Sequence, residues 1–145
     1  MPSLALPEIH EVHKEDWDKR TPSFTPYTAL EIKHSGNGGY DFFVNVDNTF
    51  LLTEIVRAKD EDRPLVKFWF KFGLALCAMG MLHEAKRREE VANRQAEKPE
   101  SENGNGDAKD GFVADLEQIG MYCSGVAGVI VPIIRRLYRG PDRPL

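Results

Sequence analysis

Cysteine is scarce in this chain, and its scarcity excludes two means of stabilisation. Cys77 and Cys123 are the only cysteines among 145 residues, and each lies inside an apolar stretch. Two such residues provide neither a disulfide framework nor the paired cysteines of a zinc site, and they are typical of small buried side chains. The sequence therefore predicts a reducing, cytoplasmic setting.

Positive charge is not in excess, and an export signal is missing. The formal net charge is -4, which removes the electrostatic attraction that supplies much of the affinity in nucleic-acid binding. The first 13 residues lack a basic stretch followed by an apolar one, so we expect no export signal. The composition therefore argues against a nucleic-acid partner.

Motifs that carry chemistry are also missing. The sequence contains no phosphate-binding loop, dinucleotide fingerprint, zinc-ligand spacing or nucleophile elbow. His10 and His13 have ligand-like spacing, but a proline-flanked arm gives them no rigid geometry. Asp41 and Asp47 fall on the polar side of a predicted hairpin, where acids are ordinarily solvated. We predict no catalytic, cofactor-binding or metal-ligating residue and no enzyme; a small enzyme with an unrecognised site is an alternative.

What the sequence does contain predicts a single α+β domain. Apolar and polar residues alternate on both sides of the turn SGNGG, which predicts a β-hairpin over residues 27–34 and 40–47. Capping residues at Asp47, Asn48 and Thr49 then predict a short helix, with a strand as the alternative. Two long apolar helices follow, over about 65–96 and 111–138. The segments are an extended arm (1–26), the hairpin with the first long helix (27–96), a disordered linker (97–110), and the second long helix with a basic tail (111–145).

The two long helices have the features of packing surfaces. Small residues recur every four positions on the second helix and leave one stripe nearly bare, so that another helix can approach closely. A two-stranded hairpin cannot cover two helices that are apolar on nearly every side. We therefore expect a second copy or a protein partner to supply surface. The predicted interaction residues are aromatic on the first helix, small on the second and basic at its end: Phe68, Trp69, Phe72, Gly120, Ser124, Gly128, Arg135 and Arg136.

The second helix also allows a membrane interpretation. Residues 118–134 carry no charge and span about 25 Å, against a hydrocarbon core of about 30 Å. Arg135 and Arg136 suit a cytoplasmic end or lipid head groups, although solvated arginines that complement the helix dipole are the plainer interpretation. An alternative function is therefore a membrane-associated protein anchored by residues 118–134.

One part of the chain resembles a known family. Residues 40–50 read YDFFVNVDNTF, and the apolar helix FWFKFGLALCAMGMLHE follows over 68–84. This order is similar to the C-terminal accessory region of large bacterial GHKL-type ATPases, in which a strand ending in an Asn-x-Asp sequence leads into a short helix and a long apolar one. The resemblance covers under half of the chain, and the nucleotide-binding helices and glycine boxes of that family have no counterpart here. It implies an oligomerisation or coupling module beside a larger protein, without ATP binding.

The sequence thus favours a non-catalytic interaction or oligomerisation module. We expect it to act as an accessory subunit of a larger bacterial complex, either through a protein partner or as a homo-oligomer, and to need no cofactor. Contact with a membrane surface is the alternative that the second helix supports.

Overall fold

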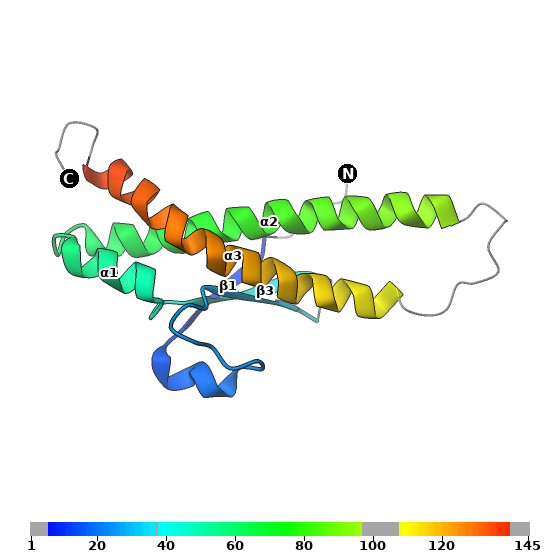
Figure 1. Cartoon of the computed structure of the whole chain (residues 1–145), viewed down its shortest axis with the longest axis horizontal. Coiled ribbons are helices and arrows are strands. Elements are labelled where there is room, and N and C mark those ends of the chain that lie inside the picture. Colours follow the sequence, from blue (N-terminus) through cyan, green and yellow to red (C-terminus); the bar gives the residue numbers. More distant parts are fainter. Residues whose placement is uncertain (1–5, 37, 97–107, 140–145) are drawn as a thin grey trace.

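The computed structural model describes residues 6–36, 38–96 and 108–139, and it confirms the predicted α+β class (Figure 1). A small sheet and a short helix come first, and two long helices follow. In chain order the elements are β1 (Glu8–Val12), the 3-10 helix η1 (Lys14–Lys19), β2 (Leu30–His34), β3 (Tyr40–Asn45), α1 (Thr49–Arg57), α2 (Arg63–Ala96) and α3 (Ala108–Arg139).

The sheet has three strands in the order β1-β3-β2, one more than the predicted hairpin. β2 and β3 form that hairpin and run antiparallel, whereas β1 comes from the predicted arm and runs parallel to β3. The prolines at 7 and 22 lie outside β1, so they leave its backbone donors intact, and Val12 is buried at its end. Within the predicted extended arm (1–26), residues 8–12 therefore form a strand and residues 14–19 form a short 3-10 helix, neither of which was predicted as a regular element.

The strands have one apolar face and one polar face. Phe42 and Val44 of β3 are fully buried, and Leu30 and Ile32 of β2 join them in the core beneath the long helices. Side chains alternate along a strand, so Asp41 and Phe43 lie on the opposite, open face. η1 lies beside that face, where the Trp17 Nε1 donates a hydrogen bond to Asn45 Oδ1 at 3.0 Å.

Two buried asparagines join the hairpin to α1. The Asn48 Oδ1 accepts hydrogen bonds from the backbone N–H groups of Phe50 and Leu51, which is the predicted N-cap. The Nδ2 groups of Asn45 and Asn48 both donate to the carbonyl of Thr28, at 2.8 and 3.1 Å. These bonds fix the loop before β2 against the start of α1.

The two long helices cover the apolar face of the sheet. They run in opposite directions and cross, and the last turns of α2 project beyond the sheet (Figure 1). Lys67 and Lys71 of α2 pair with Glu11 of β1 at 3.0 and 2.9 Å, whereas Gly120 of α3 lies against β2. Both predicted helices are confirmed, and each begins two or three residues earlier than predicted. Most of the predicted linker (97–107) lies outside the described residues, and 108–110 are already helical.

Candidate functional site

The feature of the surface that stands out is a row of aromatic and aliphatic side chains on α2. Leu65, Phe68, Phe72 and Leu76 follow one another at intervals of three and four residues, which places them on one side of the helix. Phe68 and Phe72 are 54% and 42% exposed, and their rings stack with centroids 5.8 Å apart. Trp69 meets both rings edge-on, at 5.9 and 6.0 Å. This side of α2 therefore presents a rigid aromatic cluster to solvent.

A second exposed apolar row runs along α3. Tyr122, Val129, Ile133 and Leu137 are all well exposed, and their spacing places them on one flank of the helix. A separate flank carries the buried residues Cys123, Ala127 and Ile134. The α3 helix is therefore apolar on both sides, and folding buries only one of them.

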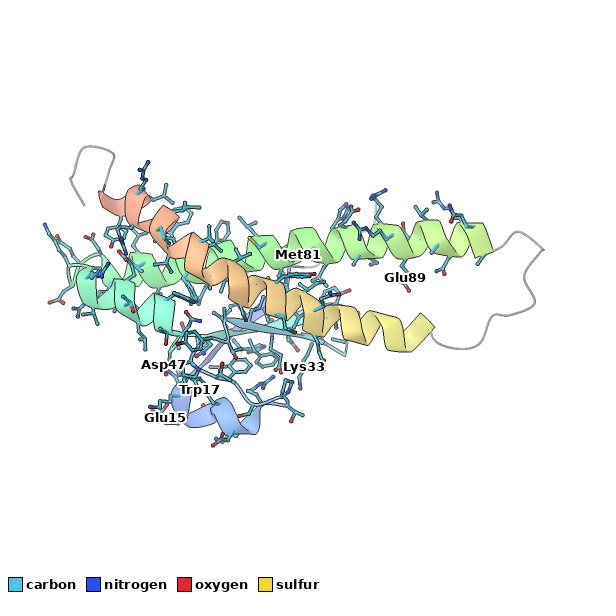
Figure 2. The ribbon with its side chains drawn as sticks, viewed as in Figure 1. Glu15, Trp17, Lys33, Asp47, Met81 and Glu89 are labelled. Atoms are coloured by element: carbon cyan, nitrogen blue, oxygen red, sulfur yellow. The ribbon has the colours of Figure 1, made fainter. Side chains whose placement is uncertain are left out.

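The two rows flank the line along which α2 and α3 touch. At the crossing, a Cβ added at Gly73 of α2 would lie 3.5 Å from the Ile130 side chain of α3. A helix has 3.6 residues per turn, so Phe72 and Leu76 lie beside Gly73 on the side of α2 that faces away from the core. On α3, Val129 and Ile133 lie beside Ile130, also on the side that faces away from the core. We call these exposed apolar side chains of α2 and α3 the outer helix face. Met81 lies where the helices begin to diverge (Figure 2).

The small residues of α3 face inward. A Cβ at Gly120 would lie 2.9 Å from the carbonyl oxygen of Leu30, and the Ser124 hydroxyl accepts a hydrogen bond from the Ala29 N–H at 2.9 Å. A Cβ at Gly128 would lie 3.3 Å from the Phe50 ring of α1. Another helix does approach this stripe at Gly128, but that helix is α1, whereas Gly120 and Ser124 lie against β2 and the residue before it. Of the predicted residues, Phe68 and Phe72 belong to the outer helix face, Trp69 is partly buried beside them, and the three small residues face inward.

The two predicted arginines, Arg135 and Arg136, also differ in whether they are open to a partner. Arg136 is exposed, whereas Arg135 donates two hydrogen bonds to Glu54 Oε2, at 2.9 Å from Nε and 2.6 Å from Nη2. Glu54 is fully buried on α1, and its other oxygen accepts a hydrogen bond from the Tyr138 hydroxyl. The hydrogen bonds that Arg135 donates to the Glu54 carboxylate raise the pKa of Arg135. Arg135 therefore holds the end of α3 against α1 and is occupied within the chain.

From the sequence, Glu54 is a candidate carboxylate to which, like Asp41 and Asp47, no catalytic role is assigned. It lies three residues after Leu51 and four before Ala58, both buried, so it falls on the apolar side of α1. An acid in that position requires a buried partner. That pattern is the signal that could have drawn attention to Glu54, although nothing in the pattern points to Arg135 or Tyr138, which lie more than 80 residues later.

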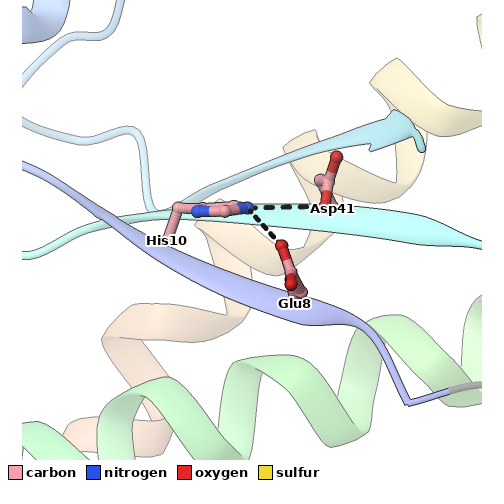
Figure 3. A group of neighbouring side chains, drawn as sticks. All are labelled: Glu8, His10 and Asp41. Carbon is pink, nitrogen blue, oxygen red and sulfur yellow. Dashed lines mark hydrogen bonds and ion pairs between the residues drawn. The ribbon is translucent and has the colours of Figure 1, made fainter. Parts of the chain in front are cut away.

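Polar groups cluster on the open face of the sheet. The His10 Nε2 lies 3.6 Å from a Glu8 oxygen and 3.4 Å from Asp41 Oδ1, and its ring stacks on Phe43 (Figure 3). These three groups could each give one ligand atom to a metal ion. They lie on an exposed surface where such pairs are common, and among the described residues nothing else points to an ion.

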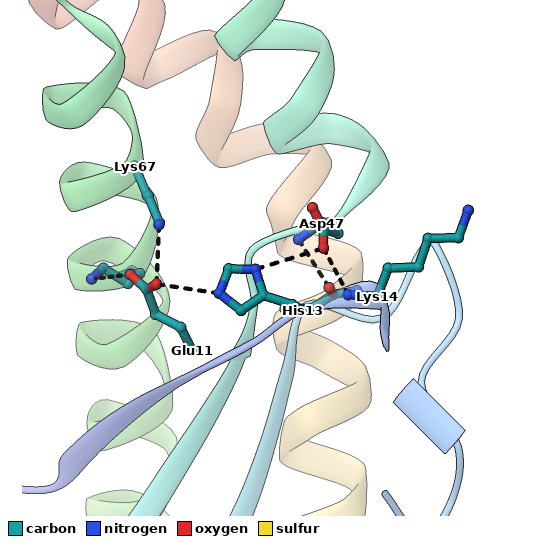
Figure 4. Close-up of polar contacts among 7 residues, drawn as sticks. Glu11, His13, Lys14, Asp47 and Lys67 are labelled. Carbon is teal, nitrogen blue, oxygen red and sulfur yellow. Dashed lines mark hydrogen bonds and ion pairs between the residues drawn. The ribbon is translucent and has the colours of Figure 1, made fainter. Parts of the chain in front are cut away.

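A second polar cluster joins β1 to its neighbours. Glu11 lies between Lys67 and His13, and the Asp47 carboxylate accepts a hydrogen bond from the Lys14 N–H at 2.7 Å (Figure 4). The hydrogen bond from Lys71, reinforced by Lys67, lowers the pKa of Glu11 below its ordinary value. Each of these groups pairs with an element that it holds in place, so the cluster has a structural role.

Comparisons with known proteins give no relative: no family model, curated protein or solved structure matches this chain.

Proposed function

We propose that this protein is a non-catalytic interaction module, and that a second copy of the chain covers its outer helix face. The stacked and exposed Phe68 and Phe72 rings are the observation that carries this proposal. Large apolar patches on folded proteins mark interaction sites, and aromatic side chains are enriched at the centres of interfaces. Trp69 holds both rings in place, so little side-chain entropy is lost when a partner covers them.

The most buried polar groups among the described residues are occupied within the chain, which is consistent with the proposed module without catalysis. Glu54, Arg135 and Tyr138 bind one another in the interior, and Glu11 binds two lysines. General acid–base catalysis needs groups that converge on a place open to substrate. The GHKL-type resemblance adds the proposal that the module serves as an accessory subunit of a larger cytoplasmic complex; under that proposal a different protein would cover the same face.

The mass of the assembled protein tests self-association. The chain has a mass of 16.4 kDa, and we expect light scattering during size exclusion, without detergent, to give a dimer or larger species. A variant with Phe68→Ser and Phe72→Ser should return to the monomer mass and keep the circular-dichroism spectrum of the folded chain, because both side chains are exposed in the single chain. Val56→Ser is the matched control: Val56 is 76% exposed on α1, away from this face. If the unaltered chain is a monomer at all concentrations, self-association is wrong.

One further observation favours a membrane surface as a second candidate. The helical segments Arg63–Ala96 and Leu116–Tyr138 are each long and apolar enough to cross a membrane. Their most apolar stretches have mean hydropathies of 1.6 and 1.4, and 33% of each stretch is buried in the fold. Helices with an apolar flank and aromatic side chains also lie in the plane of a membrane surface. Lipid would then cover the outer helix face in place of protein.

A further inference from the structure

β2 is an edge strand of the sheet, and part of its outer edge has no partner within the described part of the chain. The strand order β1-β3-β2 leaves one side of β2 without a neighbouring strand. The Asn45 N–H donates to the Ala29 carbonyl and the Ser35 N–H donates to the Gly39 carbonyl, which fixes the alternation of bonds along the hairpin. In an antiparallel pair, alternate residues turn their backbone groups toward the partner and away from it. Glu31 and Lys33 therefore bond to β3, and the N–H and C=O groups of Ile32 point outward.

A groove runs along this edge. It has a volume of about 710 Å³ and lies between β2, the segment from Thr21 to Thr28, and the α3 residues Leu116 to Ser124. Gly120 of α3 packs directly against the Leu30 carbonyl, so the helix covers the first residue of β2. Among the described residues, no hydrogen bond reaches the backbone groups of Ile32 from this side. Ile32 is one of the residues that line the groove, so its outward backbone donor and acceptor lie in a mostly apolar setting without a partner among the described residues.

We propose that this groove binds an extended peptide segment of a partner protein, which adds a fourth strand beside β2. Strand addition uses main-chain hydrogen bonds for affinity and side-chain pockets for specificity. The Ile32 N–H would donate to a peptide carbonyl, and the Ile32 carbonyl would accept from a peptide N–H. The proposal rests on the sheet edge and is independent of the outer helix face.

The side chains beside the groove indicate the chemistry of the peptide. A residue opposite Ile32 would point toward the helices, where Leu116 and the exposed Met121 present apolar surface. A residue opposite Lys33 would point to the open face. Glu31 on that face is already paired with Arg20 at 2.9 Å, whereas Lys33 is exposed and has no ion pair among the described residues (Figure 2). The segment that fits best alternates apolar residues with acids.

A library of random heptapeptides displayed on phage and selected on the immobilised protein tests the proposal. We expect the selected peptides to alternate apolar and acidic residues. A synthetic copy of such a peptide should slow hydrogen exchange at the Ile32 amide, which exchanges faster than those of Glu31 and Lys33 in the free protein. Selection that yields no common pattern, or a bound peptide that protects amides elsewhere and leaves Ile32 unchanged, would overturn the proposal.

Two further measurements test whether the peptide binds at this groove and whether a second copy fills it instead. Lys33→Glu should bind the selected peptides roughly fivefold more weakly and should select basic residues in place of acids. Lys86→Glu, an exposed change of the same kind on the projecting end of α2, is the matched control and should leave the selection unchanged. If the Ile32 amide is protected in the free protein and becomes unprotected on dilution, a second copy fills the groove and the peptide proposal is wrong.

Discussion

At the residue scale, the buried acid Glu54 holds the ends of two helices together. Its carboxylate accepts hydrogen bonds from Arg135 and Tyr138, and its side chain has no contact with solvent. Removing one partner of a buried ion pair leaves the other charge without compensation and costs more than the pair contributes. The last turns of α3 are therefore fixed to α1 by charge as well as by apolar contact.

Glu54→Gln should lower the free energy of unfolding by about 3 kcal/mol, because Arg135 loses the charge that faces it. Urea denaturation followed by circular dichroism measures this change. Glu84→Gln is the matched control: Glu84 pairs with Arg87 at 2.7 Å on the exposed part of α2, where solvent screens the pair. Equal urea midpoints for the two variants would contradict the structural role of Glu54.

Glu11 makes the contact between β1 and α2 dependent on pH. Lys71 and Lys67 lower the pKa of Glu11 below the ordinary value of 4.5. The folded state therefore favours the ionised carboxylate more than the unfolded chain does. The resulting stabilisation is fully present above that ordinary value and is lost as the pH falls through the lowered pKa of the folded state.

Glu11→Gln should therefore lower the melting temperature at about pH 7, where the carboxylate is ionised. The difference from the unaltered protein should shrink as acid protonates Glu11, and calorimetry across an acid series measures it. A difference that stays constant down to the most acidic condition in which the protein folds would show that the lysine pairs do not stabilise the contact.

At the element scale, glycine sets how closely α3 approaches the sheet. Gly120 lies where any side chain would collide with the Leu30 carbonyl, whereas a Cβ at Gly125, further along the same helix, has no neighbour within 4 Å. Because both glycines lie inside α3, the gain in helix propensity from alanine is the same for each.

Gly120→Ala should destabilise the protein by about 1 kcal/mol or more, since α3 or β2 must move to accept the methyl group. Gly125→Ala should stabilise it by up to about 1 kcal/mol through helix propensity alone. Thermal unfolding of the two variants gives the comparison directly. A stabilised Gly120→Ala would mean that α3 is free to shift from β2.

The long helices and the hairpin could be predicted from local pattern, because period and capping residues are local signals. The Asn48 cap and the alternation around Phe42 and Val44 are therefore confirmed. β1 could not be predicted, because five mostly polar residues carry little pattern and pair with a strand more than 30 residues away. The inward stripe of α3 and the Glu54 pair depend in the same way on distant partners. The exposed aromatic residues of α2 could be proposed from the sequence, because two apolar helices exceed what a small sheet covers.

At the scale of the whole molecule, the sheet limits what the apolar helices can do in a membrane. Glu11 of β1 pairs with Lys67 and Lys71 along the apolar part of α2, and the open face behind it carries Glu8, His10 and Asp41. If α2 crossed a bilayer in this fold, those charges would lie at the depth of the hydrocarbon, where they are costly. If lipid meets this fold, we therefore predict contact at a membrane surface in place of a spanning hairpin.

A vesicle flotation assay distinguishes a protein that lies on the membrane surface from one that spans the bilayer. We expect the protein to remain in the supernatant of cells lysed without detergent, and any protein that floats with anionic vesicles to be released by alkaline carbonate. Phe68→Ser with Phe72→Ser should abolish flotation if lipid covers the outer helix face, and Val56→Ser should leave it unchanged. Protein that stays with the membrane through carbonate would mean that α2 and α3 leave the sheet and insert, because the packed fold cannot bury its Glu11 pairs in lipid.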